Sequence, residues 1–297
     1  AAIEVFDPMT QTAEPAGLLR RRQVVPREPV RGVDSAVDGL AVVLDQKGWA
    51  DLEAVAGLLG GALSVDQVAD QLGDAIFRVP PTAADHNPER PWVTRAAYLS
   101  GNVRSKLTEA RTAALTDPEI WQHNVDALVA VVPADIQAGD IHANLGAVWI
   151  PARDHEAFLR EILDARYPTV HRVSGSTWEV NHANHGVLAT RQWGTERLPA
   201  GELMRKLMEQ SPIEVYDTIK GDRGERDQRV LNRVETDAAI EKAEQLASRF
   251  AEWVWEDGER TARLVEDYNR MFNSVVLRDY TAEGAALSLP GLASSFE

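Results

Sequence analysis

Apolar residues recur at three- and four-residue spacing through most of the chain, which predicts a helix-rich protein. Between residues 34 and 74 the pattern occurs three times, with interruptions at Gly48 and at Gly60-Gly61. Asp51 and Ser64 stand where helix N-caps are expected. The residues expected to face inward are Val37, Leu40, Ala41 and Leu44, then Leu52, Val55, Ala56 and Leu59, then Val65, Val68, Ala69 and Leu72.

Two short apolar segments follow these helices, "AIFRVP" (75–80) and "PWVTRAAY" (91–98), and we interpret them as strands. Three helices followed by a two-stranded wing is the order of a winged helix. Its third helix would enter the DNA major groove, but it carries Asp66, Asp70 and Asp74 and neither Lys nor Arg. Because carboxylates repel phosphates, we interpret this unit as a module that packs against protein rather than one that reads DNA.

The next segment predicts a helical hairpin over residues 99–135, which completes a helical domain from 34 to 135. Its first helix runs from about Asn102 to Ala114, and the second starts at Asp117-Pro118 and breaks at Pro133. The four prolines and the Arg20-Arg21-Arg22 run within residues 1–33 are typical of a solvated linker.

Residues 136–218 mix alternating and helical patterns, which predicts a compact α+β domain. The expected elements are strands at 147–151, 186–193 and 213–219, a hairpin around Ser174-Gly175, and helices at 154–163 and 201–210. Residues 219–235 read as a charged loop. A helical pair follows at 236–274, with Thr236 as its cap and a stripe of Ile240, Ala243, Ala247, Phe250 and Val254, before an extended exit segment at 275–297. The fold class is therefore α+β and helix-rich.

Composition narrows the functional classes. The 297-residue chain has no cysteine, which excludes disulfides and thiolate metal sites and fits a reducing compartment. No apolar run is long enough to span a bilayer, and the first residues lack a signal-peptide pattern, so we expect a cytoplasmic protein. The net charge of −15 argues against tight DNA binding by the isolated chain, because phosphate neutralisation supplies most of that affinity.

The chain lacks the sequence signatures of nucleotide chemistry. Neither GxxxxGK[ST] nor GxGxxG occurs. Asp154, His155 and Glu156 are consecutive acid–base residues, but neighbouring positions of a helix start point in different directions, so we interpret the carboxylates as favourable first-turn charges. We expect most of the eight tryptophans to be buried rather than to stack on nucleic-acid bases.

Seven basic residues are candidates for phosphate contact. In "YLSGNVRSKL" the start of a helix carries Arg104 and Lys106, which would suit an anion, although the same residues also fit an ordinary capped helix with solvated charges. The other candidates are Arg191 and the basic residues of the charged loop, Lys220, Arg223, Arg226 and Arg229.

A metal site is the weaker candidate chemistry. His182 and His185 lie three residues apart in "NHANH", and His171 lies upstream on an expected strand. Imidazoles ligate zinc and other transition metals. The strand or loop context, without a nearby carboxylate at known spacing, favours a polar hairpin end.

Several longer motifs resemble a known group of proteins. These are "YLSGNVRSKL", "NVDALVAVVPADIQAGDIHANLGAVWIP", "WGTERLPAGELM", "VYDTI", "FAEWVWEDGERTARLVEDYNRMFNSVVLRDY" and "LSLPGLA", in this order. Over about residues 36–292 the chain resembles the central segment of large bacterial and phage proteins that fuse an N6-adenine DNA methylase to a superfamily-two helicase, a group that includes phage antirestriction proteins.

The resemblance implies a connector between two catalytic parts. It carries no catalytic residue onto this chain and implies no cofactor within it, whereas ATP and S-adenosylmethionine would serve the parent protein. The flanking methylase and helicase domains would be its partners. Two alternatives stay open: a target-recognition domain that selects the methylated sequence, and a small metal-dependent hydrolase or nuclease in residues 136–218 that uses His171, His182 and His185.

Overall fold

The computed structural model describes residues 4–15, 30–220 and 226–280, and these form two compact units. The first unit contains the described residues up to Ser100 together with Glu109–Asn124 and residues 278–280, and the second contains Gly101–Thr108 and Val125–Leu277. The architecture is mixed α+β, with helices and small two-stranded sheets, as the sequence predicts. Among the described residues no helix is both long and apolar enough to cross a bilayer.

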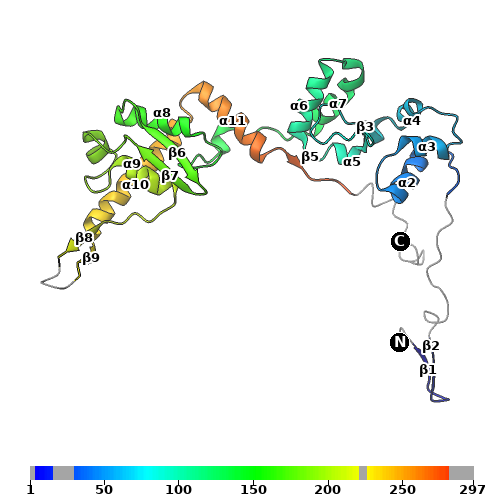
Figure 1. Ribbon diagram of the computed structural model, residues 1–297, viewed down its shortest axis with the longest axis horizontal. Coiled ribbons are helices and arrows are strands. Elements are labelled where there is room, and N and C mark those ends of the chain that lie inside the picture. The colour runs from blue at the N-terminus through cyan, green and yellow to red at the C-terminus, as the bar shows by residue number, and fades with distance from the viewer. Residues whose placement is uncertain (1–3, 16–29, 221–225, 281–297) are drawn as a thin grey trace. The chain divides into compact units, whose positions relative to one another are not determined.

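The first unit contains the predicted winged helix (Figure 1). Its helices are α2 (Ala36–Lys47), α3 (Leu52–Leu58) and α4 (Val65–Leu72), and a 3₁₀ turn, η1 (Gly73–Ala75), follows them. The wing is an antiparallel pair, β3 (Ile76–Arg78) with β4 (Trp92–Thr94), in which Ile76 lies opposite Thr94. Three helices and a wing therefore occur in the expected order.

Side-chain caps begin the second and third of these helices where the sequence predicts them. Asp51 accepts from the Ala54 amide, and Ser64 with Gln67 forms a complete capping box. The buried face of α2 is shifted by one residue from the predicted one: Ala36 and Val43 are buried, whereas Val37 is exposed. Gly39 lies where α2 approaches α3 so closely that a Cβ would come within 2.9 Å of Val55.

Beyond the wing, only the first part of the expected 91–98 strand is extended. Residues 95–98 form a helical turn, α5 (Arg95–Tyr98), because the Thr94 side chain caps the Ala97 amide. The two predicted hairpin helices follow as α6 (Val103–Ala114) and α7 (Pro118–Val131). The Phe77 ring lies between those of Tyr98 and His123, at centroid distances of 4.8 and 4.9 Å, and this stack fixes the wing against its neighbours in the first unit.

The second unit has one hydrophobic core that joins the expected 136–218 domain to the expected helical pair. Its main elements are α8 (Ala152–Leu163), β6 (Thr169–Ser174), β7 (Thr177–Asn181), α9 (Ala200–Met208), α10 (Arg233–Trp253) and α11 (Gly258–Phe272), with a 3₁₀ turn, η2 (Ala138–Asp140), before them. Phe250 packs edge-on against Phe158 at 5.1 Å. These regions are not separate domains, because each buries its apolar face against the other.

Two predicted strands are wrong. Residues 147–151 form consecutive turns, in which the Ala147 amide bonds Asn144 and the Ile150 amide bonds Ala147. Residues 187–193 contain a π-helical turn, η3 (Leu188–Gln192), closed by the bond from the Trp193 amide to Leu188. Adjacent buried residues such as Trp149 and Ile150 show why the strand pattern misleads here, since a half-buried strand would bury only alternate positions.

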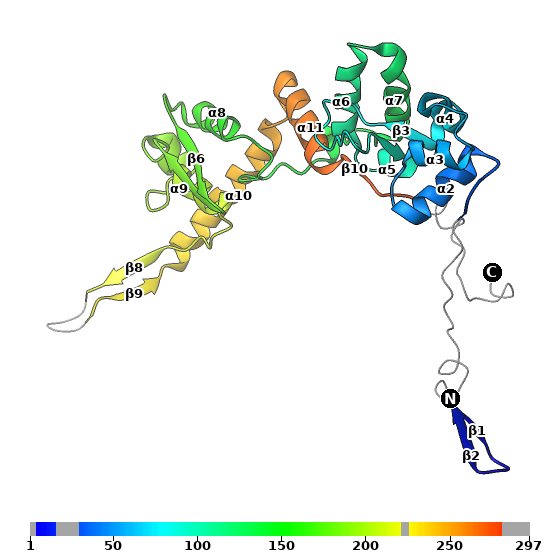
Figure 2. The ribbon, with the colours of Figure 1, turned by 45° about the vertical axis from the view of Figure 1, so that its right-hand side comes forward.

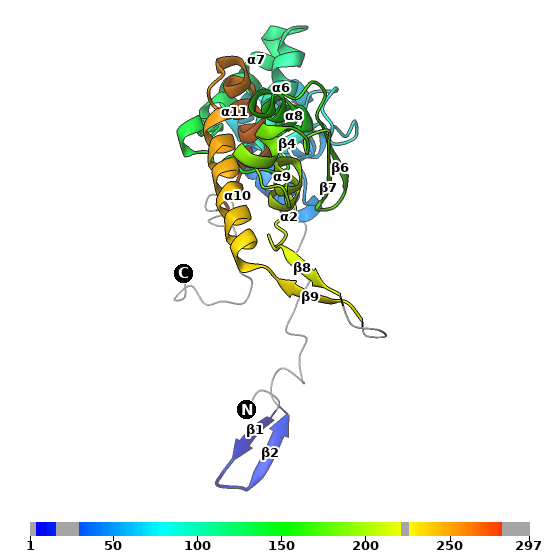
Figure 3. The same cartoon turned by 90° about the vertical axis from the view of Figure 1, so that its left-hand side faces the viewer.

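The described part of the predicted charged loop contains a strand and the start of a helix. The strands β8 (Tyr216–Ile219) and β9 (Gln228–Leu231) pair antiparallel as a ribbon at the N-terminal end of α10 (Figure 2 and Figure 3). The first residue of α10 is Arg233 and its cap is Asn232, not Thr236. Thr236 is buried inside the helix, where its hydroxyl accepts from the Val215 amide at 3.0 Å.

Two further strand pairs were not predicted. The short strands β5 (Gly101–Asn102) and β10 (Val275–Val276) pair antiparallel in the second unit. Within the expected 1–33 linker, β1 (Glu4–Asp7) and β2 (Thr12–Pro15) form a hairpin. The Asp7 carboxylate stabilises its turn by accepting from the Met9 amide and the Thr10 hydroxyl, both at 2.9 Å.

Candidate nucleic-acid interface

Arg104 is held by groups of its own chain. Its guanidinium donates to the carbonyl oxygens of Asn273 at 2.8 Å and Pro133 at 2.7 Å, and it lies 2.8 Å from the Asp135 carboxylate. The side chain is only 19% exposed. These contacts engage Nε and Nη2 of the guanidinium, so Arg104 has a structural role that joins three segments of the second unit.

Two more candidates, Lys106 and Arg191, also interact with groups of their own chain. Lys106 is half-buried and has an intramolecular partner. Arg191 lies at the surface in η3 and pairs with Glu196 at 3.3 Å, with both side chains more than 70% exposed. An exposed pair of this kind is weak, so Arg191 can exchange its partner for a phosphate at little cost.

The remaining candidates belong to the β8–β9 ribbon and to the segment between its two strands. Lys220, Arg226 and Arg229 are exposed, whereas Arg223 lies outside the described residues, as do the Arg20-Arg21-Arg22 run and "LSLPGLA". Arg229 lies across the ring of Tyr216 with its guanidinium carbon 4.6 Å from the ring centroid. In the pairing register Tyr216 faces Leu231 and Thr218 faces Arg229, so these four residues share one face of the ribbon.

One carboxylate of the ribbon, that of Asp217, is already paired within the chain. Asp217 accepts from Arg197 and from Asn232, both at 2.8 Å, and these bonds, that from Arg197 foremost, lower the pKa of the Asp217 carboxyl. It lies on the ribbon face opposite to Arg229. The ribbon therefore presents Arg229 to solvent, and Lys220 and Arg226 are exposed just beyond its strand ends. The sequence predicts the strand that carries Tyr216, but it gives no pairing partner for that strand, because residues 228–231 are interpreted as part of a charged loop.

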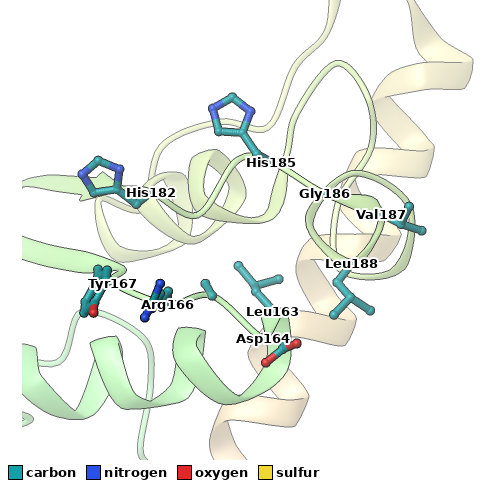
Figure 4. A pocket seen from close by; sticks show the side chains of 10 residues that line it. Leu163, Asp164, Arg166, Tyr167, His182, His185, Gly186, Val187 and Leu188 are labelled. Atoms are coloured by element: carbon teal, nitrogen blue, oxygen red, sulfur yellow. The ribbon is translucent and has the colours of Figure 1, made fainter.

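The three candidate histidines do not form a metal centre. His171 lies on β6 opposite Glu179, while His182 and His185 follow β7. In Figure 4 the imidazoles of His182 and His185 stand apart at the rim of a pocket and do not point at one another. Across the described ranges, no group of three or more His, Asp or Glu side chains is placed to hold a metal ion.

The consecutive residues at the start of α8 diverge, as expected. Helix α8 begins at Ala152 with Pro151 as its cap, so Asp154 is not the cap but lies inside the first turn. Asp154 accepts from Arg263 at 2.6 Å, whereas Glu156 accepts from the Val170 amide at 3.0 Å. Neither carboxylate faces a common substrate position with His155.

His155 is a core residue. It is fully buried, and its ring stacks on Phe250 at 5.1 Å. Nε2 accepts from the Gly146 amide, which places the proton on Nδ1, and Nδ1 donates to the Pro151 carbonyl, both at 3.2 Å. Burial lowers the pKa of His155 to about 4, so the imidazole stays neutral near pH 7. It therefore holds α8 against the preceding turn rather than moving protons.

The third helix of the winged helix presents acidic and amide groups to solvent. Asp66, Gln67, Asp70 and Gln71 are exposed on α4, whereas Val68 and Leu72 face the core. Within residues 32–93 ten carboxylates accompany three basic residues. Repulsion from phosphates therefore acts on the helix that most often enters the major groove.

Comparisons with known proteins agree with the geometry. Residues 32–93 match the family described as the winged helix domain of probable helicases, and residues 144–274 match a domain of unknown function, DUF8437. The comparisons with curated proteins and with solved structures return no match. The chain thus contains a winged-helix domain of the kind associated with helicases. The segment that matches the domain of unknown function contains most of the core of the second unit.

Proposed function

We propose that this chain is a non-catalytic accessory module of a larger helicase, and that its parent protein is a fusion of an N6-adenine DNA methylase with a superfamily-two helicase. The match of residues 32–93 to helicase winged helices supports the first part. The methylase part rests on the motif resemblance over residues 36–292. In that setting the chain positions the flanking catalytic domains, and ATP and S-adenosylmethionine bind to those domains.

The observation that carries the proposal is the acidic outer face of α4. A winged helix that reads DNA presents cations or neutral polar groups to the groove, and here Asp66 and Asp70 take those positions. Such a face suits a basic protein surface, because opposite charges guide and orient protein association. The winged helix therefore docks onto protein, and any contact with DNA is made elsewhere on the chain.

The β8–β9 ribbon supplies that contact. A two-stranded ribbon fits the major groove. Arg229 lies exposed on it, and Lys220 and Arg226 are exposed just beyond its strand ends. Binding by so few cations is weak and falls steeply with salt, which agrees with the net charge of −15. The ribbon guides duplex DNA locally and does not anchor the protein.

A fluorescence anisotropy titration of duplex DNA at low salt tests this proposal. The variant K220A/R226A/R229A is compared with R111A/R153A/R160A, which removes the same charge from exposed arginines on α6 and α8. The ribbon variant is expected to weaken binding about tenfold and to reduce the slope of log K against log salt by about 2–3, because each phosphate contact contributes about 0.9. Equal losses in the two variants, or no detectable binding by the native chain, would remove the DNA-guiding role.

The docking role of α4 has a separate readout. Gln71 is exposed on α4, next to Asp70 in sequence, and carries no charge. Q71A is expected to leave DNA affinity unchanged, since no groove contact is lost. A clear loss in Q71A would show that α4 reads DNA and would overturn the protein-docking assignment.

A further inference from the structure

A pocket of about 600 Å³ opens in the second unit between the segment that follows α8 and the loop that follows β7 (Figure 4). One side carries Asp164, Arg166 and Tyr167, and the other carries His182 and His185, with Leu163, Val187 and Leu188 as apolar lining. A volume of about 300–1,000 Å³ is usual for small-molecule and nucleotide sites. The pocket is therefore large enough for a nucleotide unit.

The groups around this pocket that can carry positive charge are not used by the fold. Within the described residues, no hydrogen bond or ion pair holds the side chains of Arg166, His182 or His185, and the one recorded contact of Arg166 is with the Tyr167 ring at 5.5 Å. By contrast, Arg205 in the same unit is bound by Glu202 and Glu209. In a chain of net charge −15, three unengaged basic groups at one opening favour an anionic ligand.

The backbone at this pocket is unusual on both sides. Asp164 has φ +48° and His182 has φ +59°, and these are two of the four left-handed residues other than glycine in the described ranges. Asp and His tolerate this region better than most residues, but it still costs conformational energy, and such positions cluster at ligand sites.

We propose that this pocket binds a phosphate group of single-stranded DNA, with the neighbouring base on the ring of Tyr167. Arg166, His182 and His185 face the phosphate, while Tyr167, which is 69% exposed, offers a stacking surface. Asp164 opposes the ligand charge and limits its affinity. The proposal relies on the proposed function only for the identity of the ligand, since the ribbon addresses duplex DNA and the pocket addresses an unpaired strand.

The test is an anisotropy titration with a fluorescein-labelled oligothymidylate of about 12 nucleotides at low salt. R166Q, H182N/H185Q and Y167L are each expected to weaken binding about fivefold or more, whereas D164N is expected to strengthen it about twofold. Asn is chosen at 164 and 182 because it tolerates a positive φ. R153Q serves as the matched control, because Arg153 is exposed on α8 but does not line the pocket.

R166Q is expected to weaken binding and D164N to strengthen it, whereas a loss of folding would weaken binding in both variants. Thermal unfolding of each variant checks the fold directly. Binding equal to that of the native chain in all pocket variants, or no oligothymidylate binding at all, would overturn the proposal. So would displacement of the oligonucleotide by millimolar inorganic phosphate alone, since the site would then recognise a free anion. A failure of the proposed function gives a different result. In that case K220A/R226A/R229A would keep the duplex affinity of the native chain, whatever the pocket variants do to oligothymidylate binding.

Discussion

The guanidinium of Arg104 lies 2.8 Å from the Asp135 carboxylate and also binds the carbonyl oxygens of Pro133 and Asn273. One side chain near the start of α6 thus joins a segment about 30 residues later to another about 170 residues later. Its neighbour Val103 adds a backbone bond to Ser274 at 2.9 Å. Three of the motifs that carry the family resemblance contact one another here. Their polar residues at this junction therefore stabilise the fold and need no catalytic role.

The first prediction concerns this junction. R104A is expected to lower the free energy of unfolding by about 3 kcal/mol, because three charge-assisted bonds are lost and two carbonyls lose a donor. Urea denaturation measures the change. R111A, on the exposed face of the same helix, is expected to change it by less than about 0.5 kcal/mol. A stable R104A protein with weakened DNA binding would instead assign Arg104 to phosphate contact.

A second prediction follows from the buried His155. Its folded-state pKa of about 4 lies below the ordinary 6.5, so between these values the unfolded chain binds a proton that the folded chain refuses. Stability from this group is complete above about pH 6.5 and is lost as the pH falls towards 4, with a total of about 3 kcal/mol. Denaturant titrations across pH 4 to 7 measure the slope.

H155Q isolates that contribution. The amide cannot titrate and keeps only one of the two hydrogen bonds, so the variant is expected to be about 1–3 kcal/mol less stable at pH 7. Its pH dependence between 4 and 6.5 should be correspondingly shallower than that of the native chain. If both proteins lose stability in parallel over this range, His155 is not held neutral by burial.

A third prediction concerns Asn269 in α11, which is 1% exposed. Its amide accepts from the Ile136 amide and donates to the carbonyls of Ile136 and Val265, all at 2.9 Å. N269A is expected to cost about 3 kcal/mol through unpaired backbone groups. N269D should cost more, since a buried carboxylate cannot donate to either carbonyl. Thermal unfolding ranks the two, and an N269D protein as stable as the native chain would contradict this network.

The wing gives a fourth prediction. Phe77 is 1% exposed between Tyr98 and His123, and Asn124 donates to the Arg78 carbonyl and to the Tyr98 hydroxyl. F77A is expected to destabilise the first unit by about 3–5 kcal/mol through cavity formation and the loss of two stacking contacts. Limited proteolysis and chemical denaturation measure the effect. F77L, which keeps most of the volume, should cost clearly less.

Local patterns gave reliable predictions where one helix buries one face. Leu52, Val55 and Ala56 are buried as expected, and the Ser64 cap is in place. The stripe of α10 was less reliable: Ala243 and Phe250 are buried, but Ile240 is 38% exposed while Leu246 and Trp253 take core positions. A helix that is covered from two sides has no single stripe, and spacing alone does not show which side is covered.

The candidate sites could not be predicted in the same way, because their contacts join distant segments. Nothing near Arg104 in sequence indicates that its partners are Pro133 and Asn273. The sequence did not identify Arg166 and Tyr167 as candidate binding residues, because the other pocket residues, His182 and His185, belong to a different loop. The basic residues at and beside the β8–β9 ribbon can be read directly from the sequence. Which face of the ribbon each side chain takes depends on the strand register, in which Tyr216 pairs with Leu231.

Hydrogen–deuterium exchange of the whole chain, with and without duplex DNA at low salt, tests the central claim most directly. The account predicts slower exchange in the β8–β9 ribbon, residues 216–219 and 228–231, and unchanged exchange in α4, residues 65–72. Slower exchange confined to α4, with none in the ribbon, would show that the winged helix reads DNA and would contradict the account.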